Sequence, residues 1–104
     1  MHYVRCVFEQ VDWSKRGTYM ERRHGITPQI ANDALGDAGR VEIDPDYNST
    51  SGRSVRIIGF SIIAAEIITV NVLEAEGTEY GVNGWVANEK DRRLYNESGQ
   101  HEQD

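Results

Sequence analysis

GWVANEKDRRLY, residues 84–95, is the stretch that decides the fold, because it runs the end of a predicted strand directly into a short basic helix. Asn88 is a residue type that caps helix N-termini, and Asp91 three positions later partly resembles a capping box. The helix carries two cations, Arg92 and Arg93, and a hydroxyl, Tyr95. Held rigidly at a sheet edge, these groups can interact with the negative charge of a phosphate. The alternative is a solvated C-terminal helix without such a role.

Three runs of β-forming residues precede this segment. Residues 54–63 and 66–74 are dense in Ile and Val, and they predict a central hairpin that is buried on both faces. Residues 78–86 form a weaker run, because Gly81 and Gly84 within it indicate a bulge or a close approach of another backbone. Together these runs predict an antiparallel sheet that leads into the basic helix.

The N-terminal part of the chain predicts a strand followed by a helix. Alternation of side-chain character over residues 3–9 suits a first strand. Asp12 is placed to cap a helix over residues 13–24, and Gly25 would end that helix by adopting a left-handed backbone conformation.

A second helix and an edge strand follow. Thr27 is a good cap, Pro28 fits the first helical position, and Gly36 marks the exit from the helix. Residues 41–44 predict a short edge strand, and residues 44–52 predict a polar loop rich in turn-forming residues.

This order of elements predicts an α+β domain. Two N-terminal helices and one C-terminal helix would pack on a small antiparallel sheet of four to five strands. We expect residues 1–96 to form the single domain and residues 97–104 to form a flexible acidic tail. The tail carries three negative charges that no Lys or Arg opposes, from Glu97, Glu102 and Asp104.

Composition favours a globular protein and weighs against a generic nucleic-acid binder. The 104 residues suit one domain, and 38% hydrophobic with 27% charged residues is ordinary for a globular chain. The formal net charge is -6, whereas nucleic-acid-binding domains are usually basic. Subtracting the three charges of the tail leaves -3 for the body, which weakens this objection without removing it.

Cysteine, histidine and hydropathy patterns limit which compartment and which cofactors we expect. Cys6 is the single cysteine, which excludes an intrachain disulfide and is compatible with a reducing cytoplasm. The N-terminus lacks a secretory signal pattern, and charged residues interrupt the apolar run at 55–73, so we expect no membrane span. The three histidines are far apart and have no metal-site spacing. We therefore expect a cytoplasmic protein without a metal or another cofactor.

His24 is the strongest candidate for acid–base chemistry. Histidine is the residue type whose charge most readily changes near neutral pH, and Arg22 and Arg23 precede His24 at the end of a predicted helix. The alternative is a packing histidine that shares a helix face with Met20 and Trp13.

The central strand and the last strand add further candidates. Arg53 and Arg56 flank the central strand, and Arg56 would reach the same sheet face as the last helix or remain a surface charge. Trp85 would stack on an RNA base if exposed, or fill the core if buried.

Several segments resemble, in the same order, those of one family of bacterial proteins. They are Asp12 with Lys15 at the first helix, RRHG at 22–25, Asp46 in an acidic turn, SVRIIGFS at 54–61, IITVNVL at 67–73 and ANEKDRRLY at 87–95. Over about 85 residues, this pattern resembles the BrnT toxins of type II toxin–antitoxin systems, which belong to the RelE-like group of small ribonucleases.

The resemblance implies a RelE/barnase-like fold and a toxin that cleaves RNA without a metal. It also implies a cognate DNA-binding antitoxin that neutralises the toxin in a hetero-oligomer. Metal-independent cleavage needs a base, an acid and cations that stabilise the phosphate transition state. For these roles we expect His24, Arg92, Arg93 and Tyr95 as catalytic residues, and Lys15, Arg53, Arg56 and Trp85 as RNA-binding residues.

Departures from the family pattern favour an alternative. Trp85 and Val86 follow Gly84 where the family has basic residues, and Phe60 stands where the family often has Arg. A chain with this depleted basic centre would be a catalytically inactive toxin-like protein that binds or regulates through a protein partner. A third alternative is an unrelated enzyme for a small ligand, although the sequence has no phosphate-binding loop or nucleophile motif for it.

Overall fold

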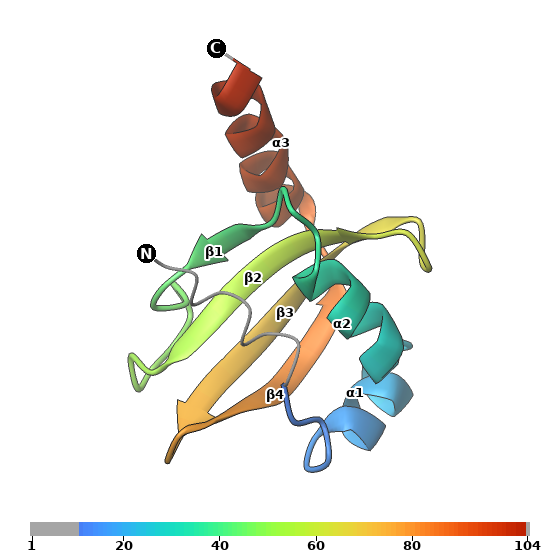
Figure 1. The fold of residues 1–104 in the computed structure, drawn as a ribbon, viewed down its shortest axis with the longest axis vertical. Helices are drawn as coiled ribbons and strands as arrows, with labels where there is room; N and C mark the ends of the chain where they lie inside the picture. The colour runs from blue at the N-terminus through green and yellow to red at the C-terminus, as the bar shows by residue number, and fades with distance from the viewer. Residues whose placement is uncertain (1–10, 104) are drawn as a thin grey trace.

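The protein has the α+β architecture predicted from its sequence (Figure 1). A computed structural model describes residues 11–103, with side chains described through residue 98. Four antiparallel strands form one sheet in the order β1-β2-β3-β4. The elements are α1 (Gly17–His24), α2 (Pro28–Leu35), β1 (Val41–Ile43), β2 (Ser54–Ser61), β3 (Glu66–Ala75), β4 (Thr78–Val86) and α3 (Glu89–Gln103). The strand predicted over residues 3–9 lies outside the described residues.

The core lies between the sheet and the pair α1 and α2. In β2 and β3, Ile57, Ile68 and Val70 point to this side and are fully buried. Helix α1 packs on β4, and α2 packs on β2 and β3 (Figure 1). The central hairpin was predicted correctly, although β2 ends at Ser61 and not at residue 63, because residues 62–65 form the turn to β3.

Helix α1 begins later than predicted. It starts at Gly17 instead of residue 13, and no side chain caps it. Asp12 was expected to be the cap, but its carboxylate accepts hydrogen bonds from the backbone N–H and the hydroxyl of Ser14 at 2.8 and 2.6 Å. This local bond holds the backbone in a turn before the helix. Gly25 ends α1 at φ 74°, as predicted.

Helix α2 has the predicted start and an unusually close contact with the sheet. The Thr27 hydroxyl accepts from the Ile30 N–H at 3.2 Å, and Pro28 occupies the first helical position. Gly59 in β2 lies directly beneath the helix, where a Cβ atom would be 2.1 Å from the Ala34 carbonyl oxygen. The glycine of this strand therefore allows α2 to lie on the sheet.

Strand β4 contains the bulge that its glycines predicted, and at Gly81 a side chain, not another backbone, approaches it closely. The register with β3 shifts between Asn71 and Val72, so that Val82 is the extra residue of a bulge. A Cβ atom on Gly81 would lie 2.3 Å from the ring of Trp13, so the indole packs directly on the strand backbone.

Helix α3 begins at the predicted cap and packs against β1 and β2. Asn88 accepts from the Asp91 N–H at 2.9 Å. The helix continues to Gln103 and projects beyond the sheet (Figure 1), so most of the predicted flexible tail is helical.

Candidate functional site

The sheet has a second face, opposite α1 and α2, that we call the open face. Side chains alternate along a strand, so the residues next to the core positions point to it. In β2 and β3 these include Arg56, Thr69 and Asn71, and in β4 they include Trp85. The start of α3 and the loop at residues 44–53 approach this face near Arg56.

Arg56 is the centre of a buried polar network on the open face. Its side chain is only 3% exposed. The guanidinium Nε donates to Asp46 Oδ1 at 2.9 Å, and Nη1 donates to Asp91 Oδ2 at 2.6 Å and to the Tyr47 hydroxyl at 3.0 Å. Burial opposes the charge of Arg56, but the bonds to Asp46 and Asp91 outweigh it and raise the pKa of the guanidinium. The alternative of a surface charge at Arg56 is therefore wrong.

Asp91 connects α3 to this network. Its side chain is fully buried, and it accepts from the hydroxyls of Tyr47 at 2.6 Å and Thr69 at 2.8 Å in addition to Arg56. Burial alone would raise the pKa of this carboxyl, but the hydrogen bonds from Tyr47, Thr69 and Arg56 hold it below its usual value. Asp91 is thus ionised at neutral pH and is not a proton donor.

Asp46 holds the loop at residues 44–53 against the sheet in a similar way. Its Oδ2 accepts from the Asn71 amide at 2.6 Å, while its backbone N–H donates to the Ser54 carbonyl at 2.8 Å. The ring of Tyr47 lies under the Arg56 guanidinium at 4.2 Å. The loop is therefore tied to the strands through buried charges.

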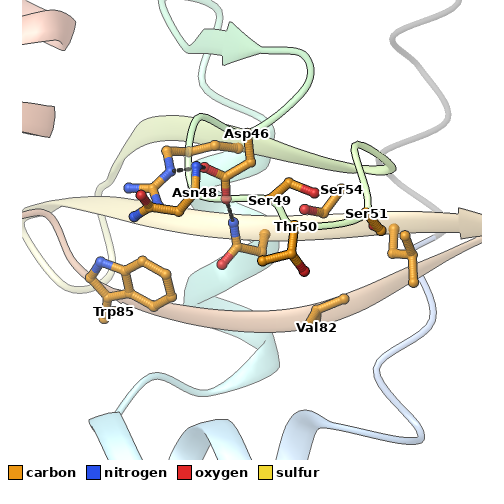
Figure 2. Close-up of a pocket in the computed structure, with 11 residues that line it drawn as sticks. Asp46, Asn48, Ser49, Thr50, Ser51, Ser54, Val82 and Trp85 are labelled. Carbon is orange, nitrogen blue, oxygen red and sulfur yellow. Dashed lines mark hydrogen bonds and ion pairs between the residues drawn. The ribbon is translucent and has the colours of Figure 1, made fainter.

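A polar pocket of about 380 Å³ lies between this loop and the sheet. Figure 2 shows Asp46, Asn48 and Thr50 of the loop on one side, with Trp85 and Val82 of β4 on the other. Most of the lining groups are uncharged hydroxyls and amides. They come from Asn48, Ser49, Thr50, Ser51, Ser54 and Asn71.

Trp85 lies between two of the predicted site residues. The Arg56 guanidinium is 5.5 Å from the indole centroid, and the His24 ring centroid is 5.8 Å from it at an angle of 51°. Trp85 and His24 are both half-buried, so neither simply fills the core. Three predicted site residues from α1, β2 and β4 therefore converge.

A second depression of about 510 Å³ adjoins the polar pocket, because Leu73 and Val82 line both. It also contains Lys15 and Tyr80, whose ammonium nitrogen and ring centroid are 5.4 Å apart. Arg16 lines it as well, and its Nε donates to the Val82 carbonyl at 3.2 Å.

The other predicted site residues do not join this cluster. Arg92 and Arg93 are exposed on α3, and Arg53 is exposed at the end of the loop. Tyr95 donates its hydroxyl to Asp37 Oδ2 at 2.6 Å. Burial and this bond raise the pKa of Tyr95 to about 12, which makes the hydroxyl a poor proton donor at neutral pH.

Sequence reasoning missed five members of the network: Asp46, Tyr47, Thr69, Asn71 and Asp91. Asp91 was interpreted as part of a cap, and Asp46 only as part of a turn. A usable signal was present in β3, where Thr69 and Asn71 alternate with buried Ile and Val residues. Polar residues at every second position of an apolar strand indicate a face that is either solvated or covered by polar groups.

The fold and the site define a small α+β protein with a polar pocket on the open face of its sheet. No protein-family model matches the chain, and no curated protein matches it in sequence. Among residues 11–98, whose side chains the structure describes, no three His, Cys, Asp or Glu are grouped so that they could hold a metal ion. None of the helices described between residues 11 and 103 has the length and apolar character that crossing a membrane requires.

Proposed function

We propose that this chain is the cytoplasmic toxin of a type II toxin–antitoxin pair and that it acts on RNA at the open face. The convergence of His24, Arg56 and Trp85 carries this proposal. The ordered resemblance to BrnT toxins supports it independently. RNA recognition commonly combines an aromatic platform with hydrogen-bonding groups that meet unstacked bases, and the polar pocket offers both.

His24 has the best position for proton transfer in such a site. It lies against Trp85, which lines the polar pocket, whereas the hydroxyl of Tyr95 is bonded to Asp37. The carboxylate of Asp91 is held in its ionised form by three donors. In the proposed reaction His24 removes the proton of the ribose 2′-hydroxyl as that oxygen attacks the adjacent phosphorus, and the leaving 5′-oxygen takes a proton from water.

A protein partner fits the same proposal. The turn between β2 and β3 exposes apolar side chains, with Ile62 80% and Ile63 64% exposed, and Phe60 lies beside them at 39%. Contiguous exposed apolar residues are typical of protein interfaces. We propose that a DNA-binding antitoxin forms a hetero-oligomer with the chain and neutralises it.

Expression of the chain without its antitoxin tests this function. We expect growth arrest with cleaved transcripts, and we expect His24→Gln to reduce cleavage about 100- to 10,000-fold. Tyr19→Phe, an exposed change on the same helix, is the matched control. Normal growth with intact transcripts, from protein shown to be folded, would contradict the toxin proposal.

The second candidate is a catalytically inactive toxin-like protein that binds or regulates through a partner. The ion pairs of Arg56 favour this candidate, because two buried carboxylates, Asp46 and Asp91, already neutralise the cation of the polar pocket. This candidate predicts a stable complex with the partner and no RNA cleavage. Cleavage by the purified protein that is lost in His24→Gln would exclude it.

A further inference from the structure

The two depressions on the open face form one groove along β4. The polar pocket lies at one end and the depression with Lys15 and Arg16 at the other, and Leu73 and Val82 line both. Each end has one aromatic ring from β4, Trp85 or Tyr80. Five positions separate these rings, which corresponds to about 13–17 Å along a strand that contains a bulge.

The charges at the Trp85 end disfavour a phosphate. Arg56 is held between Asp46 and Asp91, so this buried group of three carries one negative charge in total. The remaining polar lining consists of hydroxyls and amides. An uncharged ring that stacks on Trp85 and forms hydrogen bonds with Asn48 and Thr50 suits this end.

The charges at the Tyr80 end favour a phosphate. Lys15 and Arg16 both line it beside one acid, Glu76, and the nearby carboxylate of Asp12, which attracts Lys15, lies outside the lining and is bonded to Ser14. Lys15 is exposed, and its ammonium group lies over the Tyr80 ring. Cations beside an aromatic ring are the usual components of sites for single-stranded nucleic acid.

We propose that this groove binds a short single-stranded RNA segment in one direction, with a base stacked on Trp85 in the polar pocket and a phosphate at Lys15 and Arg16. The proposal rests on RNA as the ligand of the proposed function, but it does not require cleavage. It assigns phosphate binding to the turn before α1, instead of to Arg92 and Arg93 on α3.

The base-binding end is tested with purified protein and a short single-stranded oligoribonucleotide at fixed salt. We expect Trp85→Ala to weaken binding about 5- to 150-fold. Thr50→Val, which removes one exposed hydroxyl of the pocket, should weaken binding about 2- to 12-fold without touching the buried network. An abasic oligonucleotide of the same length should bind weakly to the wild-type protein, and Trp85→Ala should not weaken it further.

The phosphate-binding end is tested through the salt dependence of the same binding. Log affinity falls as log salt concentration rises, and Lys15→Gln should make this slope shallower by about 0.7, the value for one phosphate contact with a single strand. Lys90→Gln makes the same charge change on α3, outside the groove, and should leave the slope unchanged.

The outcomes separate the groove from the catalytic proposal. Binding that is unchanged in Trp85→Ala, Thr50→Val and Lys15→Gln, with each variant shown to be folded by its melting curve, overturns the groove even if the protein cleaves RNA. Absence of RNA binding, with a partner protein captured instead by the Trp85 face, overturns it as well. RNA binding that these substitutions weaken, without RNA cleavage, supports the proposed groove and contradicts only the proposal that the protein cleaves RNA.

Discussion

At the scale of single residues, Arg56 organises the open face. This arginine lies in a central strand and is 3% exposed. Its guanidinium nitrogens form ion pairs with a carboxylate of a loop and with a carboxylate of a distant helix. A buried ion pair is not in itself strong stabilisation, because desolvation offsets much of the attraction. Breaking it is costly, however, because the partner charges stay buried.

This asymmetry gives a prediction for Arg56→Met. The substitution leaves Asp46 and Asp91 without their cation at 6% and 0% exposure. We expect the free energy of unfolding to fall by about 3–5 kcal/mol, measured by urea denaturation. Arg53→Met, an exposed change three positions earlier, should change it by less than about 0.5 kcal/mol.

A double variant separates charge from packing. Adding Asp91→Asn to Arg56→Met removes one of the orphaned charges, so we expect it to recover part of the lost stability. An additive loss in the double variant would mean that the Arg56 contribution is one of packing and not of charge.

At the scale of elements, hydrogen bonds attach α3 to the rest of the molecule through two of its described side chains. Asp91 in its first turn enters the buried network, and Tyr95 one turn later donates to Asp37. Asp37 also accepts from the Phe60 N–H of β2 at 2.8 Å. The helix is therefore held to both β2 and the loop that follows α2.

The Tyr95 attachment predicts a pH dependence in the alkaline range. The pKa of Tyr95 is raised to about 12 in the folded state from an ordinary value of 10.0. The folded state therefore keeps a proton that the unfolded state releases, and this stabilisation is complete below pH 10 and is lost as the pH rises from about 10 to 12. Tyr95→Phe should make the decline in unfolding free energy over this range shallower, as followed by urea denaturation.

Tyr19→Phe is the matched control for this prediction, since Tyr19 is 45% exposed on α1. We expect the unfolding free energy of Tyr19→Phe to decline with pH as steeply as that of the wild-type protein. An equally steep decline in Tyr95→Phe and in the wild-type protein would show that the hydroxyl of Tyr95 does not stabilise the fold through Asp37.

At the scale of the whole molecule, charge is distributed unevenly. The chain has a formal net charge of -6, yet Lys15, Arg16, Arg22 and Arg23 fall within ten positions around α1. The acids Glu97, Glu102 and Asp104 lie at the opposite end of the sequence. A local basic region within an acidic protein permits binding to RNA while the overall charge opposes non-specific binding.

Removal of residues 97–104 tests this distribution. The hydrogen bonds and ring contacts described for α3 lie at Lys90, Asp91 and Tyr95, all before residue 97, so the shortened chain should keep one cooperative unfolding transition. Its net charge becomes -3, and it should bind the oligonucleotide more tightly at low salt, with the difference disappearing at high salt because screening weakens distant charges. Loss of the cooperative transition would show that the end of α3 is part of the folded domain.

Much of the fold was predictable because its signals are local. Thr27 with Pro28 marked the start of α2, the glycines of β4 indicated the bulge, and the Ile and Val runs gave the central hairpin. The start of α1 was not predictable, because an Asp before a turn offers its carboxylate equally to a turn or to a helix, and packing of Trp13 on Gly81 accompanies the turn.

The sequence by itself determined the class of fold, the caps of α2 and α3, and the candidacy of His24, Arg56 and Trp85, because periodicity and residue type act over short distances along the chain. Only the tertiary structure decided which candidates meet. It joined Arg56 to Asp46 and Asp91 across 10 and 35 positions, brought His24 to Trp85, and bound Tyr95 to Asp37 across 58. Such partners depend on strand register and on which face of the sheet each side chain occupies, and no local pattern encodes the charge that a distant helix brings to that face.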